Sequence, residues 1–183
     1  MDKIKRVSLF FRAVFQIVLV VLPIILVFAW VTSPESLVIM GGVINMSFIP
    51  SAYSNSILHV LTPIDRLLGF GISSIPMLIE FYILYSLIKL FDLFSKGEIF
   101  SVNNVRHIKN IGYALLASQA VNPFYESFMG VALTLHNPKG HRFASITFDQ
   151  TNISIILVAL IVILIAWIMA EGCKLREEQQ LTI

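Results

Sequence analysis

The sequence predicts an all-α membrane protein with four transmembrane helices and a small extracytoplasmic β-hairpin or sheet element. Two uncharged runs carry this prediction, one of 21 residues between Asp149 and Glu171 and one of 22 residues between Arg12 and Glu35. A helix rises about 1.5 Å per residue, so either run covers the roughly 30 Å hydrocarbon core of a bilayer. Hydrophobic residues make up 57% of the 183 and charged residues 13%, so lipid must cover much of the apolar surface.

The predicted spans belong to one membrane domain that covers the whole chain, 1–183. The first ends before Ser33-Pro34, because proline disfavours helix in the residue ahead of it. No convincing small-residue cleavage site follows, so we interpret it as an uncleaved span rather than a signal peptide. Ser74 is an N-cap for the second span, Gly97 marks its end, and Ser101 is an N-cap for the third. The spans are residues 10–32, 75–95, 110–130 and 152–170, and the extracytoplasmic segments are 33–74 and 131–151.

The distribution of lysine and arginine predicts the orientation. Basic residues collect on the cytoplasmic side of membrane proteins. With the N-terminus inside, only Arg66, Lys139 and Arg142 lie outside. Both termini are therefore predicted to be cytoplasmic, in a multi-pass protein of the bacterial inner membrane. The ten cytoplasmic residues are Lys3, Lys5, Arg6, Arg12, Lys89, Lys96, Arg106, Lys109, Lys174 and Arg176.

The extracytoplasmic segments carry turn signals of their own. Asn137–Gly140 and the pair Gly41-Gly42 each separate two β-prone runs, which predicts two hairpins that join into one small sheet. The four predicted arms are 37–40, 43–48, 131–136 and 142–148. Before the second span, Thr62 to Asp65 resembles a capping box at the start of a short interfacial helix, Pro63–Phe70.

Glu80 and Glu126 are the two carboxylates within the predicted spans. Counted from the cytoplasmic turn between the second and third spans, both lie at nearly one height in the outer half of the membrane. One hypothesis is a pair that binds a proton or cation, because two like charges at membrane depth hold one proton more tightly. The alternative is that both lie near the headgroups, where they touch water or bond to the outer segments.

A polar stripe on the third span accompanies Glu126. Ser118, Asn122 and Glu126 are four residues apart, so they share one helix face, with Gln119 beside them. Asn122-Pro123 also removes one backbone donor and is expected to kink the helix. The stripe either joins spans by hydrogen bonds or lines a cavity.

Other chemistry finds little support. The four histidines form no metal motif, since His59 and His107 stand apart. The spacing of His136 and His141 would let them face each other across a turn, where the pair is expected to be solvated; the alternative is a pair that binds a metal or senses pH. The single cysteine, Cys173, excludes an internal disulfide and a thiolate zinc site. No catalytic set, metal site or cofactor site is predicted, so the protein is not expected to be an enzyme.

Two cytoplasmic stretches carry a family resemblance. The first is Lys96–Ser101 followed by Asn104-Val105-Arg106 and Ile108–Gly112, and the second is Glu171-Gly172, Leu175 and Glu178–Ile183. Together they resemble the YoaS-like family of small bacterial four-span inner-membrane proteins, a domain of unknown function. The resemblance implies both termini inside, no established catalytic activity, and frequent encoding beside a small helix-turn-helix regulator.

The short basic turn before the third span is a candidate docking surface, formed by Phe100, Asn104, Arg106 and Lys109. The simpler interpretation is that every inner loop carries basic residues. Partners expected beside the bilayer are a protein at this turn or at the extracytoplasmic sheet, or further copies of the chain, and not nucleic acid.

The sequence therefore favours a non-enzymatic integral membrane protein that acts through protein contacts, as a sensor, regulator or immunity-type factor. The alternative is a small proton- or cation-linked transporter or channel that uses Glu80, Glu126, Asn122 and Gln119. Four spans are few for a transporter, so that alternative would require a homo-oligomer.

Overall fold

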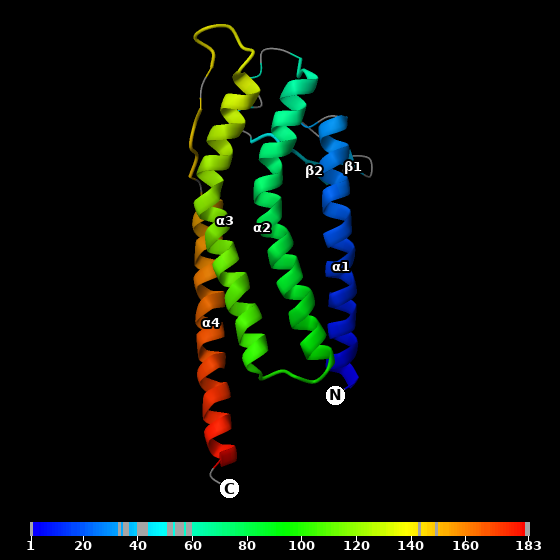
Figure 1. Ribbon diagram of the computed structural model, residues 1–183, viewed down its shortest axis with the longest axis vertical. Helices are drawn as coiled ribbons and strands as arrows, with labels where there is room; N and C mark the ends of the chain where they lie inside the picture. Colours follow the sequence, from blue (N-terminus) through cyan, green and yellow to red (C-terminus); the bar gives the residue numbers. More distant parts are fainter. Residues whose placement is uncertain are drawn as a thin grey trace. The chain divides into compact units, whose positions relative to one another are not determined.

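The computed structural model consists mainly of four long helices, shown in Figure 1. They are α1 (Asp2–Val31), α2 (Pro63–Ser95), α3 (Val102–Thr134) and α4 (Gln150–Leu181). The structure describes residues 2–32, 34, 37–39, 44–50, 53, 57, 60–142, 144–148 and 150–181.

The chain forms two compact units, each described by itself below. Segments of α1, α2 and α3 contribute to both, because each of these helices passes from one unit into the other. Unit 1 comprises Met1–Val20, Ile79–Gln119 and Gln150–Ile183, and unit 2 comprises Val21–Leu78 and Ala120–Asp149.

Three of the four described helices are long and apolar enough to cross a membrane: Lys3–Val31 of α1, Pro63–Ser95 of α2 and Gln150–Gln179 of α4. Their outward faces carry large exposed apolar side chains, such as Ile17 and Trp167, which lipid would cover. The helix α3 does not meet the same requirement, so the prediction of four apolar spans is corrected to three. Polar residues along α3, including its amide side chains, lower its hydropathy.

In unit 1, aromatic side chains hold α1 against α2. The ring of Phe91 lies 5.4 Å from that of Phe11 and 5.6 Å from that of Phe15, measured between ring centroids. Beside this cluster, the Arg12 guanidinium donates a hydrogen bond to the Asp92 carboxylate, which forms an ion pair between the two helices. The contact between α1 and α2 in unit 1 therefore combines apolar packing with an ion pair.

Gly112 brings α3 close to α4 in the same unit. A Cβ atom at this position would lie 2.5 Å from Cγ1 of Ile163 and 3.3 Å from the backbone oxygen of Ala159. Small residues at such contacts let two helix backbones approach closely in a membrane. The packing of α3 on α4 therefore depends on the missing side chain.

In unit 2, α2 begins at the predicted capping box. The Asp65 carboxylate accepts hydrogen bonds from the backbone nitrogen and the hydroxyl of Thr62, at 2.9 and 2.8 Å, and the Thr62 hydroxyl accepts one from the Asp65 backbone at 3.3 Å. This confirms the cap. Pro63–Phe70, predicted as a separate interfacial helix, instead forms the first turns of the continuous helix α2.

The contact of α1 with α2 in unit 2 rests on two residues. The Trp30 ring occupies the space that a side chain at Gly69 would fill, with a ring carbon 1.9 Å from the Cβ position. Arg66 donates hydrogen bonds to the carbonyl oxygens at the end of α1, which satisfies groups that a helix end leaves unpaired.

The predicted extracytoplasmic sheet is wrong, and the protein is a helical one. Val131–Thr134, expected as a strand, continues α3 instead, and Ala132, Leu133 and Thr134 are buried there. The expected partner arm forms no strand at residues 142 and 144–148, so the two hairpins do not join.

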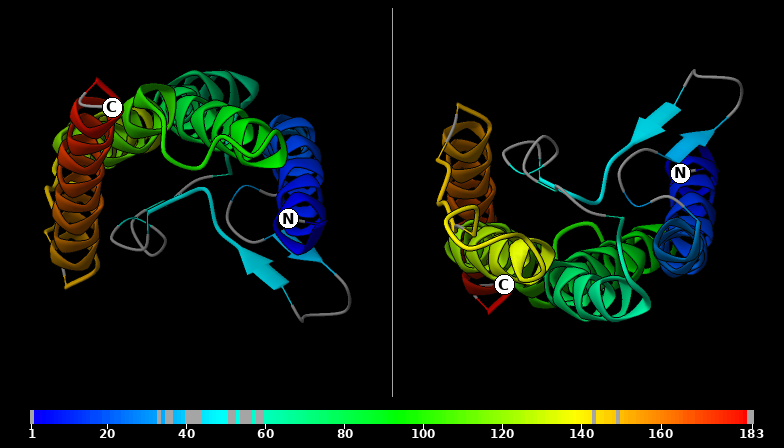
Figure 2. Two further views of the ribbon diagram at one scale, coloured as in Figure 1. Left: turned by 90° about the horizontal axis from the view of Figure 1, so that it is seen from below. Right: turned by 90° about the horizontal axis from the view of Figure 1, so that it is seen from above.

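In the described ranges, the strands amount to one antiparallel pair in unit 2, β1 (Leu37–Ile39) with β2 (Ile44–Met46) (Figure 2). Leu37 pairs with Met46 and Ile39 with Ile44. The expected turn Gly41-Gly42 lies outside the described residues.

Candidate functional site

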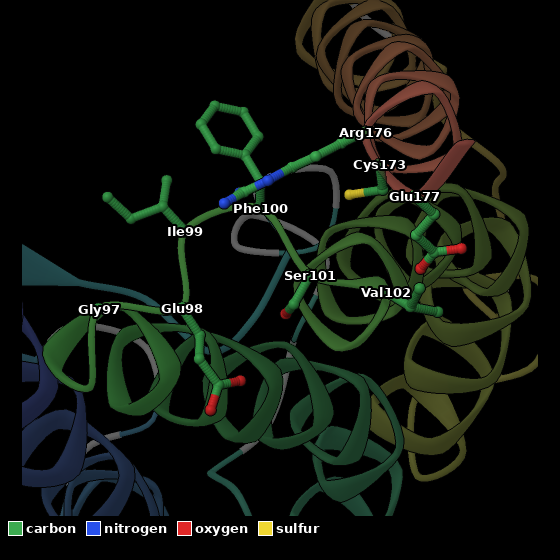
Figure 3. Close-up of a pocket in the computed structure, with 9 residues that line it drawn as sticks. All are labelled: Gly97, Glu98, Ile99, Phe100, Ser101, Val102, Cys173, Arg176 and Glu177. Atoms are coloured by element: carbon green, nitrogen blue, oxygen red, sulfur yellow. The ribbon is translucent and has the colours of Figure 1, made fainter. Parts of the chain in front are cut away.

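A pocket of about 400 Å³ lies in unit 1 between the α2–α3 turn and the C-terminal part of α4. Figure 3 shows the Arg176 side chain extending from α4 towards the turn, where Phe100 and Ile99 stand. The pocket is lined by Gly97, Glu98, Ile99, Phe100, Ser101, Val102, Cys173, Arg176 and Glu177. We call it the turn pocket.

Asn104 determines the shape of this turn. Its side-chain amide donates hydrogen bonds to the backbone oxygens of Glu98 and Ile99, the latter at 2.9 Å. Its backbone nitrogen donates to the hydroxyl of Ser101 at 3.3 Å, which confirms Ser101 as the N-cap of α3. The side chain of Asn104 is 0% exposed. Asn104 therefore fixes the conformation of the turn, but its side chain is too buried to contact a binding partner.

The other predicted docking residues are at the surface. Phe100 is 60% exposed. Arg106 is exposed on the first turns of α3, and the Lys109 ammonium lies 5.6 Å from the centre of the Tyr113 ring. Phe100 is thus an exposed aromatic side chain at the turn pocket, and Arg106 and Lys109 are exposed cations on the following helix α3.

Three pocket residues come from a part of the chain that the docking prediction omitted. Cys173, Arg176 and Glu177 lie in α4, more than seventy positions after the turn. Arg176 adds a positive charge and Glu177 a negative one to a pocket that Glu98 also lines, and the Cys173 thiol is buried at its wall. No local sequence pattern predicts that this helix end and the turn lie together.

Burial and neighbouring cations both favour the neutral form of His107, which follows Arg106 on α3. Burial lowers the pKa of His107, and the positive charges of Arg106 and Lys89 lower it further. Its Nδ1 atom is buried and has no hydrogen-bond partner among the described residues. A protonated His107 ring would therefore be repelled by the positive charges of Arg106 and Lys89.

The polar stripe of α3 is divided between the two units. In unit 1 the Ser118 hydroxyl donates to the backbone oxygen of Leu115 at 2.7 Å and accepts from Gln119 at 3.2 Å. The side-chain oxygen of Gln119 accepts a hydrogen bond from Asn152 of α4 at 3.0 Å. These contacts support the interpretation of this half as a link between helices.

Asn122 and Glu126 form the other half of the stripe, in unit 2. The Asn122 amide donates to the Glu126 carboxylate at 3.1 Å. The same carboxylate accepts from the backbone nitrogen of Thr147 at 2.9 Å and from the Thr147 hydroxyl. Glu126 thus ties α3 to the segment that precedes α4.

Glu80 lies in unit 1 and is exposed, without an ion pair or hydrogen bond to the part of the chain that the structure describes. Because Glu80 and Glu126 belong to different units, their pairing stays a prediction.

Sequence reasoning missed a contact between a buried acid and a histidine in unit 2. The Nδ1 atom of His136 lies 2.8 Å from a carboxylate oxygen of Asp65, which is 0% exposed. Asp65 was predicted as a cap and His136 as the partner of His141 across a turn. The two lie 71 positions apart, so no local pattern joins them. In the described ranges no group of three or more metal-binding side chains gathers, and His59 lies outside these ranges.

A family model matches residues 60–183, a range that contains all of α2, α3 and α4. Its description is protein of unknown function, DUF2975. The chain belongs to the DUF2975 family. The turn pocket lies entirely within the matched range, whereas α1 lies before it. The match supports a family of unknown function and does not confirm the YoaS-like name. The comparisons match no curated protein and no solved structure.

Proposed function

We propose that this DUF2975 protein is a non-enzymatic integral membrane protein that acts through protein contacts, as a sensor, regulator or immunity-type factor. Its partner is a cytoplasmic protein that binds at the turn pocket. One observation carries the proposal: Phe100 is exposed on the α2–α3 turn, and the buried side chain of Asn104 fixes the backbone of that turn by hydrogen bonds.

Such a turn has the properties of a binding hot spot. Aromatic and arginine side chains dominate binding energies when they stand beside a pocket, and a fixed backbone lowers the entropy lost on binding. Phe100 and Arg176 supply these two side chains at one pocket. The segment that fits carries an apolar side chain for the pocket and a carboxylate for Arg176, with a cation for Glu98 and Glu177.

The two units support the proposed orientation. Ten of the thirteen lysines and arginines lie in unit 1, while Arg66, Lys139 and Arg142 lie in unit 2. Unit 1 also contains the first turn of α1, the α2–α3 turn and the end of α4. We place these basic residues in the cytoplasm of a bacterium, with the protein in the inner membrane and both termini inside, an arrangement in which the less apolar α3 also crosses the membrane.

A labelling experiment tests this orientation. With Cys173 replaced by serine, a cysteine at position 100 should react with an impermeant maleimide only in inverted vesicles. A cysteine at position 139 should react in intact spheroplasts. The reverse pattern contradicts the orientation.

The transport alternative draws less support from the contacts. Glu126, Asn122 and Gln119 all engage side chains or backbone of neighbouring segments. Ion binding would have to replace these hydrogen bonds, each worth about 1 kcal/mol between membrane helices. Protein contact is therefore the function that we propose.

Photocrosslinking in native membranes tests the proposal. A benzoylphenylalanine in place of Phe100 should give one discrete protein adduct, and Arg176→Glu in the same chain should weaken it. The matched control is the same substitution at Phe128, an exposed phenylalanine of α3 in unit 2. The absence of an adduct at position 100, or the same adduct at both positions, contradicts the proposal.

A further inference from the structure

A second pocket lies in unit 1, between the start of α1 and the end of α2, with a volume of about 310 Å³. Its apolar walls are Ile4, Phe94 and Ile99, while Lys5 and Lys96 bring two ammonium groups to it. The lining is completed by Ser95 and Gly97. We call it the lysine pocket. It is separate from the turn pocket, although Gly97 and Ile99 contribute to both.

The charges around the lysine pocket sum to a positive value. Asp92 is bonded on one side to Arg12 and on the other to Lys96, at 2.8 Å from the Lys96 ammonium. Lys5 has no ion pair within the described part of the chain. The pocket lining therefore holds two cations, Lys5 and Lys96, and no carboxylate. The side chain of Lys96 is still 60% exposed, so its remaining donors can reach a ligand.

The lysine pocket stands where two spans meet the membrane surface. The apolar span of α1 begins at Lys3 and that of α2 ends at Ser95. Lysines at such positions extend their ammonium groups to the level of the lipid phosphates. Directly inside them along the helices lie the exposed Phe10 and Phe11 and the half-buried Phe91, which form an apolar cluster.

We propose that the lysine pocket binds a phospholipid with an anionic headgroup. The phosphate oxygens accept hydrogen bonds from Lys5 and Lys96, and the start of an acyl chain lies against Ile4, Phe94 and Ile99. Basic pockets between membrane helices on the cytoplasmic side are suited to such headgroups. A zwitterionic lipid would bring its own cation towards the two lysines, and free phosphate would leave the apolar walls uncovered. This binding needs no protein partner, so it stands or falls independently of the proposed function.

Native mass spectrometry of the purified full chain in a non-ionic detergent tests the site. The probes are dioleoylphosphatidylglycerol, dioleoylphosphatidylcholine and, as a competitor, inorganic phosphate in excess. We expect adducts with phosphatidylglycerol in clear preference to phosphatidylcholine. Lys5→Gln should weaken the affinity roughly fivefold, and Lys5→Gln with Lys96→Gln roughly 25-fold. Lys5→Arg should restore most of it.

The control removes the same charge outside the pocket, with Lys3→Gln and Lys174→Gln. It should leave phosphatidylglycerol binding unchanged. Equal losses in both double variants, or equal binding of both lipids, overturns the proposal in favour of general attraction. Displacement by inorganic phosphate overturns it in favour of a free anion. Because Lys96→Gln also breaks the contact with Asp92, helix content is compared by circular dichroism, and Lys5→Gln alone leaves that contact intact.

Discussion

The side-chain amide of Asn104 donates a hydrogen bond to the backbone oxygen of Glu98, six residues earlier in the chain. A second bond, to the oxygen of Ile99, fixes the next peptide of the same turn. Gly97 enters this turn with a φ of 84°, a conformation that favours glycine. The display of Phe100 therefore depends on a residue that a partner never touches.

Replacing Asn104 tests this dependence. Asn104→Ala should lower the free energy of unfolding by about 2 kcal/mol, because two part-buried carbonyl oxygens lose their donor. Unfolding in mixed micelles with increasing SDS measures the change. The neighbouring exposed Asn103 provides the matched control, and Asn103→Ala should change little. Equal losses for both variants would show that the turn does not rely on the buried amide.

Asp65 and His136 should contribute unequally to unit 2. Asp65→Asn should cost about 2 to 3 kcal/mol of unfolding free energy, because the buried carboxylate serves both Thr62 and His136. His136→Gln should cost about 1 kcal/mol, since that side chain is 43% exposed and loses one contact. The same SDS titration measures both variants and their combination. A loss for His136→Gln as large as that for Asp65→Asn would contradict the dual role of Asp65.

The approach of α3 to α4 should be sensitive to one methyl group. Gly112→Ala should destabilise the protein by about 1 to 2 kcal/mol, because the added carbon would collide with Ile163. Gly172→Ala is the control, since nothing lies within 4 Å of the added atom, and alanine favours the helix there. Thermal unfolding in detergent separates the two. If both substitutions stabilise the protein, the close contact is not required.

His107 should make stability depend on pH. The folded state lowers the pKa of His107 below its usual 6.5, so the unfolded chain binds the proton more readily. The contribution of neutral His107 to the free energy of unfolding is complete above the pKa that this residue has in the unfolded chain. It is lost as the pH falls through the pKa that His107 has in the folded protein. Stability should thus decrease as pH falls from 7 into the range below 6.5. His107→Gln should flatten this dependence, measured as unfolding midpoints across that range. An unchanged slope in the variant would assign the dependence to other groups.

Local patterns predicted much of the helical structure. The uncharged runs indicated α1 and α4, and the caps at Thr62 and Ser101 depend on residues three positions apart. The predicted strand at 131–136 failed because β-prone residues there pack as a helix against the rest of unit 2.

What sequence reasoning missed depends on contacts between distant residues. His136 meets Asp65, and Arg176 reaches the turn at Phe100, only after the helices have assembled. A stripe of Asn122 and Glu126 looks the same in sequence whether it binds an ion or holds a loop. The bond from Thr147 distinguishes these interpretations, and no helical periodicity encodes it.

The affinity of the crosslinked partner for the purified protein in nanodiscs tests the central claim most directly. Phe100→Ala should weaken binding about 30-fold, as expected for the loss of an aromatic anchor worth about 2 kcal/mol. Phe128→Ala, which removes an equally exposed ring in unit 2, should leave the dissociation constant unchanged. A partner that binds the Phe100→Ala protein as tightly as the unaltered chain would contradict docking at the turn pocket.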